Sequence, residues 1–277
     1  MNDPGVSRPL SGRARFRWGV LSRPVGADRV ARRTFMSIPR VSSRRILRAT
    51  ARGRVVVGYA IDPAQVTPLL PDGLVPARDE GTTYVSLVGV ELAALRVLGV
   101  VPPGFRRVPA VELRVHVHPV GAPDKEGTWT AQAHVPRRLV AWGARLLYGE
   151  RVAVTSMQPI QRKPVDHVEV TYRFDWKGRE QRVRARGAHP PVMPGPDARA
   201  HALLHPHWRF STARDGTLLR TRIERPAAPI CRVQEHHVSV QWPAVYGDIG
   251  RLLQNQAPAC VLLSPRTPVA LRWPERE

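Results

Sequence analysis

The chain has 277 residues, 43% of them hydrophobic and 23% charged, which is enough apolar sequence to form a large core without disulfides or metals. Its formal net charge is +21, and all but three of its 43 cationic residues are arginine. No segment approaches the roughly 18 consecutive apolar residues of a membrane span, so we expect a cytoplasmic protein that does not enter a membrane.

The N-terminal segment, residues 1–45, contains eleven arginines and no hydrophobic periodicity. This composition is typical of a disordered tail; alternatively, the segment is translated upstream sequence and Met36 is the true start. Arg32-Arg33 resembles the opening of an export signal, but further arginines follow it instead of an apolar stretch. Residues 46–277 contain no linker and no repeat, so we interpret them as one domain.

The pattern of the domain predicts mostly strands. An apolar run from near Arg54 to Ile61 predicts the first strand, and Asp62-Pro63 predicts the capped start of a short helix. Apolar residues recur every three or four positions at 136–148 and 243–254, which predicts two longer helices, and a further short helix is expected at 198–204. Alternation predicts strands at 83–92, 109–120, 127–135, 152–158, 167–176, 181–186, 208–212, 218–224, 233–242, 261–263 and 269–273. We therefore expect a mainly β (α+β) domain with a few short helices.

The strand predicted at 109–120 carries the candidate site. Its apolar residues alternate with a polar row, whose members share one face of the strand and are Glu112, Arg114, His116 and His118. If this face lines a pocket, it offers a carboxylate, an anion-binding guanidinium and two imidazoles that exchange protons near neutral pH. The same alternation is typical of a strand whose polar row faces solvent, so both interpretations stay open.

Other chemistries lack the residue patterns that they need. His116 and His118 lack the nearby glutamate of a cupin-like metal site, because Ala122 stands where it is expected. His201 and His205 lack the glutamate of an HExxH motif. The sequence contains no GxSxG elbow, no glycine-rich phosphate loop and no dinucleotide fingerprint. We therefore expect neither a metal nor a cofactor.

The high arginine content suggests a different class of function, which is the binding of polyanions such as nucleic acid. A nucleic-acid-binding protein concentrates its positive charge on one face or tail and interleaves it with aromatic residues. In residues 46–277 the excess positive charge is instead spread along the chain. We expect nucleic-acid binding to be absent or non-specific, and keep a non-catalytic polyanion-binding protein as the alternative function.

Several short motifs occur in an order that resembles a known family. They are LLPDGL at 69–74, YVSLV at 84–88, ELRVHV at 112–117, GARLLYG at 143–149 and LSPRTPVALRWP at 263–274. Over about residues 54–274, this order resembles the YqjF-like family of uncharacterised bacterial proteins, which is similar in turn to acetoacetate decarboxylase. The resemblance implies a single curved, largely antiparallel sheet or barrel that encloses a small-molecule pocket.

The resemblance also implies candidate residues, with one departure. The decarboxylase forms a Schiff base through a lysine that follows a helix. Here the helix is followed by Gly149-Glu150-Arg151, and arginine stays protonated and is not nucleophilic. Glu112 matches a glutamate of the decarboxylase site.

These observations favour a cytosolic small-molecule-binding domain and leave open whether it is an enzyme. If the domain is an enzyme, we expect it to act on an organic acid, which it binds as a carboxylate, without Schiff-base chemistry. The catalytic candidates are Glu112 and His116, and the substrate-binding candidates are Arg114, Arg151 and Tyr148. The ligand's identity and the question of a homo-oligomer stay open.

Overall fold

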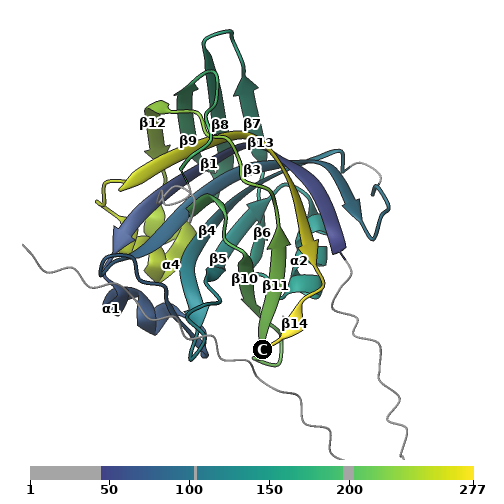
Figure 1. The fold of residues 1–277 in the computed structure, drawn as a ribbon, viewed down its shortest axis with the longest axis vertical. Coiled ribbons are helices and arrows are strands. Elements are labelled where there is room, and N and C mark those ends of the chain that lie inside the picture. The colour runs from purple at the N-terminus through teal and green to yellow at the C-terminus, as the bar shows by residue number, and fades with distance from the viewer. Residues whose placement is uncertain (1–44, 103–104, 196–202) are drawn as a thin grey trace, which may run out of the picture. The chain divides into compact units, whose positions relative to one another are not determined.

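A computed structural model describes residues 45–102, 105–195 and 203–277 (Figure 1). The predicted tail therefore lies outside the described residues except for Arg45, and so does most of the helix predicted at 198–204. Two β-sheets contain most of the described chain. None of the described helices is long and apolar enough to cross a membrane.

The larger sheet has ten strands, and the pairing of its members closes it on itself. Its path runs β2-β4-β3-β1-β13-β11-β10-β5-β6, with β14 paired to β11. Because β5 also pairs with β4, the strands from β4 to β5 form a closed ring, which is a barrel. The strands are β1 (Arg45–Ile61), β2 (Leu74–Pro76), β3 (Thr83–Val97), β4 (Arg107–Pro119), β5 (Gly127–Val135), β6 (Val152–Val154), β10 (Trp208–Thr212), β11 (Leu218–Glu224), β13 (Cys260–Arg272) and β14 (Glu275–Arg276).

Most neighbouring strands of the large sheet are antiparallel, but β5 pairs in parallel with both β10 and β6. The β5–β10 pair is the step that closes the barrel, and it joins strands more than 70 residues apart in the sequence. Gly127 permits this approach, because a Cβ atom there would lie 2.4 Å from the backbone oxygen of Trp208.

The smaller sheet has four strands in the order β12-β9-β8-β7 and packs on the outside of the barrel. Its strands are β7 (Met157–Arg162), β8 (His167–Trp176), β9 (Arg179–Ala188) and β12 (Val233–Ser239). The inward residues of β8, among them Val170 and Tyr172, contact the outward residues of β3 and β4, among them Leu87 and Leu113, to form the main hydrophobic core. In Figure 1 this sheet stands at the top of the view, beyond β13 and β1.

Short helices connect the strands. Helix α1 (Pro63–Val66) begins at Asp62, whose side chain accepts a hydrogen bond from the Ala64 amide, and the 3-10 helix η2 (Thr67–Leu69) continues it. Helix α4 (Trp242–Leu253) packs against the main core. Helix α2 (Arg138–Tyr148) follows β5 and ends at Gly149, whose φ of 61° is the left-handed conformation that glycine adopts at a helix end.

The mainly β fold class predicted from the sequence is confirmed, including the curved sheet. Strand β1 begins at Arg45 rather than near Arg54, because Ile46, Ala49 and Ala51 point inward between arginines. Strand β13 is continuous where two strands were predicted, since β1 is its partner from Arg45 to Gly58. The segment predicted as one strand at 152–158 contributes β6 to one sheet and the start of β7 to the other.

Candidate functional site

Both faces of β4 are buried from Val108 to Leu113, and the polar residues after it, Arg114, His116 and His118, are half-buried. Val111 and Leu113 lie in the main core between the two sheets. The opposite face carries Ala110, Glu112 and Arg114 into the interior of the barrel, and Glu112 is only 7% exposed. A buried carboxylate is costly unless it is paired, so the partners of Glu112 define the site.

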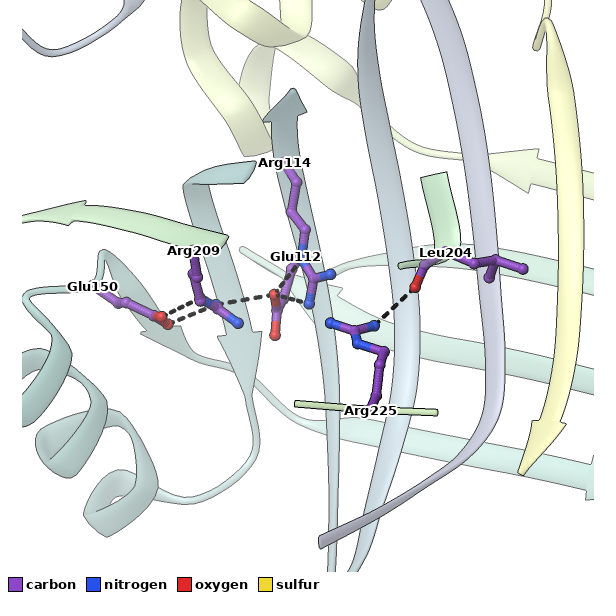
Figure 2. Close-up of polar contacts among 6 residues, drawn as sticks. All are labelled: Glu112, Arg114, Glu150, Leu204, Arg209 and Arg225. Atoms are coloured by element: carbon purple, nitrogen blue, oxygen red, sulfur yellow. Dashed lines mark hydrogen bonds and ion pairs between the residues drawn. The ribbon is translucent and has the colours of Figure 1, made fainter. Parts of the chain in front are cut away.

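Glu112 forms ion pairs with two arginines. The Nη2 atom of Arg114 lies 2.7 Å from Glu112 Oε2, and Nη2 of Arg209, on β10, donates to the same oxygen at 3.1 Å. Arg209 also donates to Oε2 of Glu150 at 2.8 Å, and its Nε is ion-paired with Oε1 of that residue. Figure 2 shows Arg209 lying between the two carboxylates. The buried carboxylate of Glu112 is therefore compensated by two guanidinium groups.

The two carboxylates have different acidities. Burial alone would raise the pKa of Glu112, but Arg114 and Arg209 outweigh it and lower that pKa to about 2. Burial raises the pKa of Glu150, which is paired with Arg209 and also lies near the negative charge of Glu112. A pair of carboxyl groups whose environments separate their pKa values is suited to acid–base chemistry, with Glu150 the more readily protonated group.

Two further arginines line a small cavity of about 70 Å³ beside Glu112, which we call the arginine pocket. Arg54 is 4% exposed, and its Nε and Nη2 atoms have no hydrogen-bond partner within the described part of the chain. Burial, together with the nearby charge of Arg114, lowers the pKa of Arg54 to about 9, which leaves it cationic at neutral pH. Arg225 donates to the backbone oxygen of Leu204 at 2.9 Å, as Figure 2 shows. The arginine pocket thus brings together four guanidinium groups, those of Arg54, Arg114, Arg209 and Arg225, with one carboxylate, that of Glu112.

A β-bulge directs Arg54 into this pocket. The pairing of β1 with β3 shifts by one residue between Arg52 and Val55, and Gly53 in the bulge has a φ of 54°. Because of the extra residue, Ala51 and Arg54 both line the arginine pocket, although regular alternation places residues three apart on opposite faces. A bulge of this kind is a common device for re-aiming a side chain beside a functional site.

A second, larger cavity of about 380 Å³ adjoins the arginine pocket, and we call it the apolar cavity. Both cavities are lined by Glu112 and Arg209, as well as by Leu47, Leu92 and Leu271. Helix α2 forms one wall, and Tyr148 at its end is buried with a hydroxyl group that lacks a hydrogen-bond partner among the described residues. Burial raises the pKa of Tyr148, so its hydroxyl is neutral and keeps the proton that it can donate in a hydrogen bond.

The other two residues predicted for the site lie elsewhere. His116 is 3.1 Å from the hydroxyl of Ser86 and lines a separate cavity with His205 and His207. Burial and the charge of Arg114 lower the pKa of His116 to about 4, so it is neutral at physiological pH. Arg151 is exposed and lines neither the arginine pocket nor the apolar cavity. The structure thus brings Glu112, Arg114 and Tyr148 together but not His116 or Arg151.

Four residues of the site were not predicted from the sequence: Arg54, Glu150, Arg209 and Arg225. Glu150 had a usable signal, because it directly follows the helix after which the decarboxylase carries its lysine. The three arginines had none, since they do not differ in sequence context from dozens of surface arginines. Their proximity follows from the bulge in β1 and from the closure of the barrel through β10.

Among the described residues, no amine lines either cavity, as Schiff-base chemistry would require. All three lysines of the chain are among the described residues, and none lines the arginine pocket or the apolar cavity. Lys125 is ion-paired with Glu277 at 3.0 Å, Lys163 lines a groove near Arg52, and Lys177 lies in the turn between β8 and β9. Among the described residues there is also no group of three or more His, Cys, Asp or Glu side chains that could hold a metal ion.

Comparison with known proteins supports the resemblance seen in the sequence. The model of the family DUF2071, described as an uncharacterised conserved protein, matches residues 48–268. No curated protein sequence matches this chain significantly.

Several solved structures share the fold. An acetoacetate decarboxylase-like enzyme from Sphingomonas wittichii RW1 aligns with a TM-score of 0.60 at 11% identity, over 84% of this chain and 94% of its own. Acetoacetate decarboxylase from Legionella pneumophila aligns with a TM-score of 0.59 at 16% identity, over 91% and 98% of the two chains. The enduracididine biosynthesis enzyme MppR, complexed with pyruvate, aligns with a TM-score of 0.58 at 13% identity, over 83% and 90%. At these identities the likeness establishes the fold alone.

Proposed function

The chain belongs to the DUF2071 family and has the acetoacetate decarboxylase-like fold, and from this premise we propose that it binds an organic acid in the barrel and transfers a proton to or from it. The observation that carries the proposal is Arg54, a buried and charged guanidinium that lines a cavity and whose Nε and Nη2 atoms have no partner among the described residues. Such a group is costly to bury, and a ligand carboxylate would compensate it. That a structural neighbour is complexed with pyruvate supports the same class of ligand.

The site's residues suit separate roles in this proposal. Arg54, Arg114 and Arg225 would hold the carboxylate of the ligand, because they bring several cationic donors to one small cavity. Glu150, whose pKa is raised, would donate or accept the proton. Glu112 stays ionised and would hold Arg114 and Arg209 in position, and the hydroxyl of Tyr148 would donate a hydrogen bond to the ligand.

The proposal excludes one reaction of the structural relatives. A decarboxylation through a Schiff base needs a lysine at the substrate, and no lysine lines the two cavities. Borohydride should therefore trap no adduct between this protein and a β-keto acid. A trapped adduct on Lys125, Lys163 or Lys177 would contradict the assigned site.

Titration calorimetry with a panel of small carboxylates tests the binding step. We expect Arg54→Met to weaken the affinity for these acids at least tenfold, because the ligand loses a charge-assisted contact in a buried site. Arg276→Met is the matched control, since Arg276 is exposed, pairs with Asp215 and lines neither cavity. Equal affinities for Arg54→Met and the wild type would overturn the proposal.

The proton-transfer step has a separate test, which is exchange of the ligand's carbon-bound hydrogen with deuterated water, followed by NMR. Glu150→Gln should abolish exchange while it leaves ligand affinity within a few fold, because the amide keeps the shape but cannot transfer the proton. Exchange that continues at the wild-type rate in Glu150→Gln would assign the proton transfer to another group.

A further inference from the structure

The sizes of the two adjoining cavities restrict the shape of the ligand. The arginine pocket, at about 70 Å³, has room for roughly two water molecules at ~30 Å³ each. This space accepts a carboxylate group but not a complete metabolite. The rest of any ligand held by Arg54 must therefore extend past residues that line both cavities, among them Glu112 and Arg209.

The space beyond these two residues is apolar. Only Glu112, Tyr148, Glu150 and Arg209 are polar among the side chains that line the apolar cavity, and ion pairs join three of them at the end shared with the arginine pocket. The remaining lining is aliphatic or aromatic, including Val108 and Ala110 on β4 and Phe105 before it. The volume of about 380 Å³ is within the range of cavities that enclose drug-sized ligands, which is roughly 300–1,000 Å³.

The lining of the apolar cavity also includes large apolar side chains that are exposed to solvent. Leu139 and Trp142 on α2 line the cavity while 68% and 62% exposed. Large apolar side chains at such exposure gain free energy when an apolar group covers them.

We propose that the ligand is an amphiphilic organic acid, with its carboxylate in the arginine pocket and an extended hydrocarbon or aryl body in the apolar cavity. This inference rests on the proposed function and adds the class of acid. An acid of three or four carbons would place its carboxylate in the arginine pocket and leave most of the apolar cavity empty. Each methylene added to the acid that becomes buried in the cavity should strengthen binding three- to fourfold, until the cavity is full.

Titration calorimetry with the straight-chain carboxylates from acetate to decanoate tests this inference, with 1-octanol as a ligand that lacks the charge. We expect the affinity to rise three- to fourfold per methylene over at least four methylenes, and octanoate to bind at least tenfold more tightly than 1-octanol. An affinity that is flat along the series but still depends on Arg54 would overturn this inference and leave the proposed function standing. Failure of every acid to bind, or equal binding of octanoate and 1-octanol, would overturn both.

A variant of helix α2 provides a second measurement that does not depend on the arginines. Gly143 lines the apolar cavity, and a Cβ atom added there meets nothing within 4 Å, so Gly143→Leu should fold and occupy part of the cavity. It should weaken octanoate binding at least tenfold and leave acetate binding unchanged. Gly195→Leu is the matched control, because Gly195 also has open space at its Cβ but lies outside both cavities. Unchanged octanoate affinity in Gly143→Leu would contradict the placement of the hydrocarbon body.

Discussion

Arg54 and Arg209 are both buried guanidinium groups in one site, but their surroundings differ. Arg209 lies between two carboxylates and is ion-paired with each of them. Arg54 has two nitrogen atoms without a partner among the described residues, and the nearby guanidinium of Arg114 repels it. Arg209 therefore stabilises the site through its ion pairs, whereas Arg54 destabilises the ligand-free protein.

Replacing these two arginines should change stability in opposite directions. Arg54→Met removes an unpaired buried charge, and we expect the free energy of unfolding of the ligand-free protein to rise by about 1–3 kcal/mol. Arg209→Met leaves two buried carboxylates without their shared partner, and we expect a loss of about 3–5 kcal/mol. Urea denaturation of both variants measures the contrast. A loss of stability in Arg54→Met comparable to that in Arg209→Met would show that Arg54 is a structural residue.

The acidity of Glu112 makes stability depend on pH. Its pKa of about 2 in the folded protein is below the ordinary value of 4.5, so its contribution is present above pH 4.5 and is lost as the pH falls toward 2. The contribution is on the order of 3 kcal/mol. Urea denaturation of the wild type and of Glu112→Gln should show the wild type more stable at pH 7, with a difference that shrinks between pH 4.5 and 2. A difference of constant size across this range would mean that Glu112 is not ionised in the folded protein.

Single backbone features of individual strands place these side chains. The bulge in β1 turns Arg54 inward, and Gly53 makes it possible with a φ that other residues adopt at a cost. Helix α2 ends at Gly149, so that Glu150 follows at the cavity and not one turn earlier. The alternation of β4 carries the lining from Ala110 in the apolar cavity through Glu112 to Arg114 in the arginine pocket.

Substitution at the bulge should affect both stability and ligand binding. Gly53→Ala forces an L-residue into the left-handed region and brings its Cβ to 2.7 Å from the side-chain nitrogen of Gln161. We expect a loss of about 1–2 kcal/mol in stability and a weaker affinity for carboxylates, because Arg54 shifts with the backbone. Gly143→Ala is the control, since it introduces no clash and should stabilise helix α2 by up to about 1 kcal/mol. Thermal unfolding and carboxylate titration of both variants measure these effects, and full ligand affinity in Gly53→Ala would show that the bulge does not position Arg54.

At the scale of the whole molecule, the net charge of +21 and the internal cluster of arginines have different consequences. Surface arginines attract any polyanion at low salt, and counter-ions compete with this attraction. Arginines inside the barrel are shielded from salt and are reached only by a ligand small enough to enter. The total charge is therefore a weak guide to function in this protein.

Salt dependence separates the two classes of function. We expect affinity for DNA to show no sequence preference and to fall more than tenfold between about 50 and 200 mM salt, while carboxylate affinity changes less than twofold to threefold. Fluorescence anisotropy with labelled DNA and calorimetry with a carboxylate measure the two responses. A footprint with sequence preference that survives at physiological salt would favour the polyanion-binding alternative.

The sequence by itself determined the strand content, the bounds of several strands, and the shared face of Glu112 and Arg114. These properties depend on local periodicity, which is a property of neighbouring residues and can be read without the fold. The sequence also showed that no lysine follows helix α2, because this observation requires only that the helix be located in the sequence.

Only the tertiary structure decided which face of β4 is buried and which arginines are internal. Alternation specifies two faces but not what covers them, and here the small sheet covers one face while the barrel encloses the other. Arg54, Arg209 and Arg225 come from three distant segments, and they meet because a bulge turns one of them and the parallel pairing of β5 with β10 closes the ring around them. His116 was misleading for the same reason: it shares a face with Glu112, but the cavity that it lines is a different one.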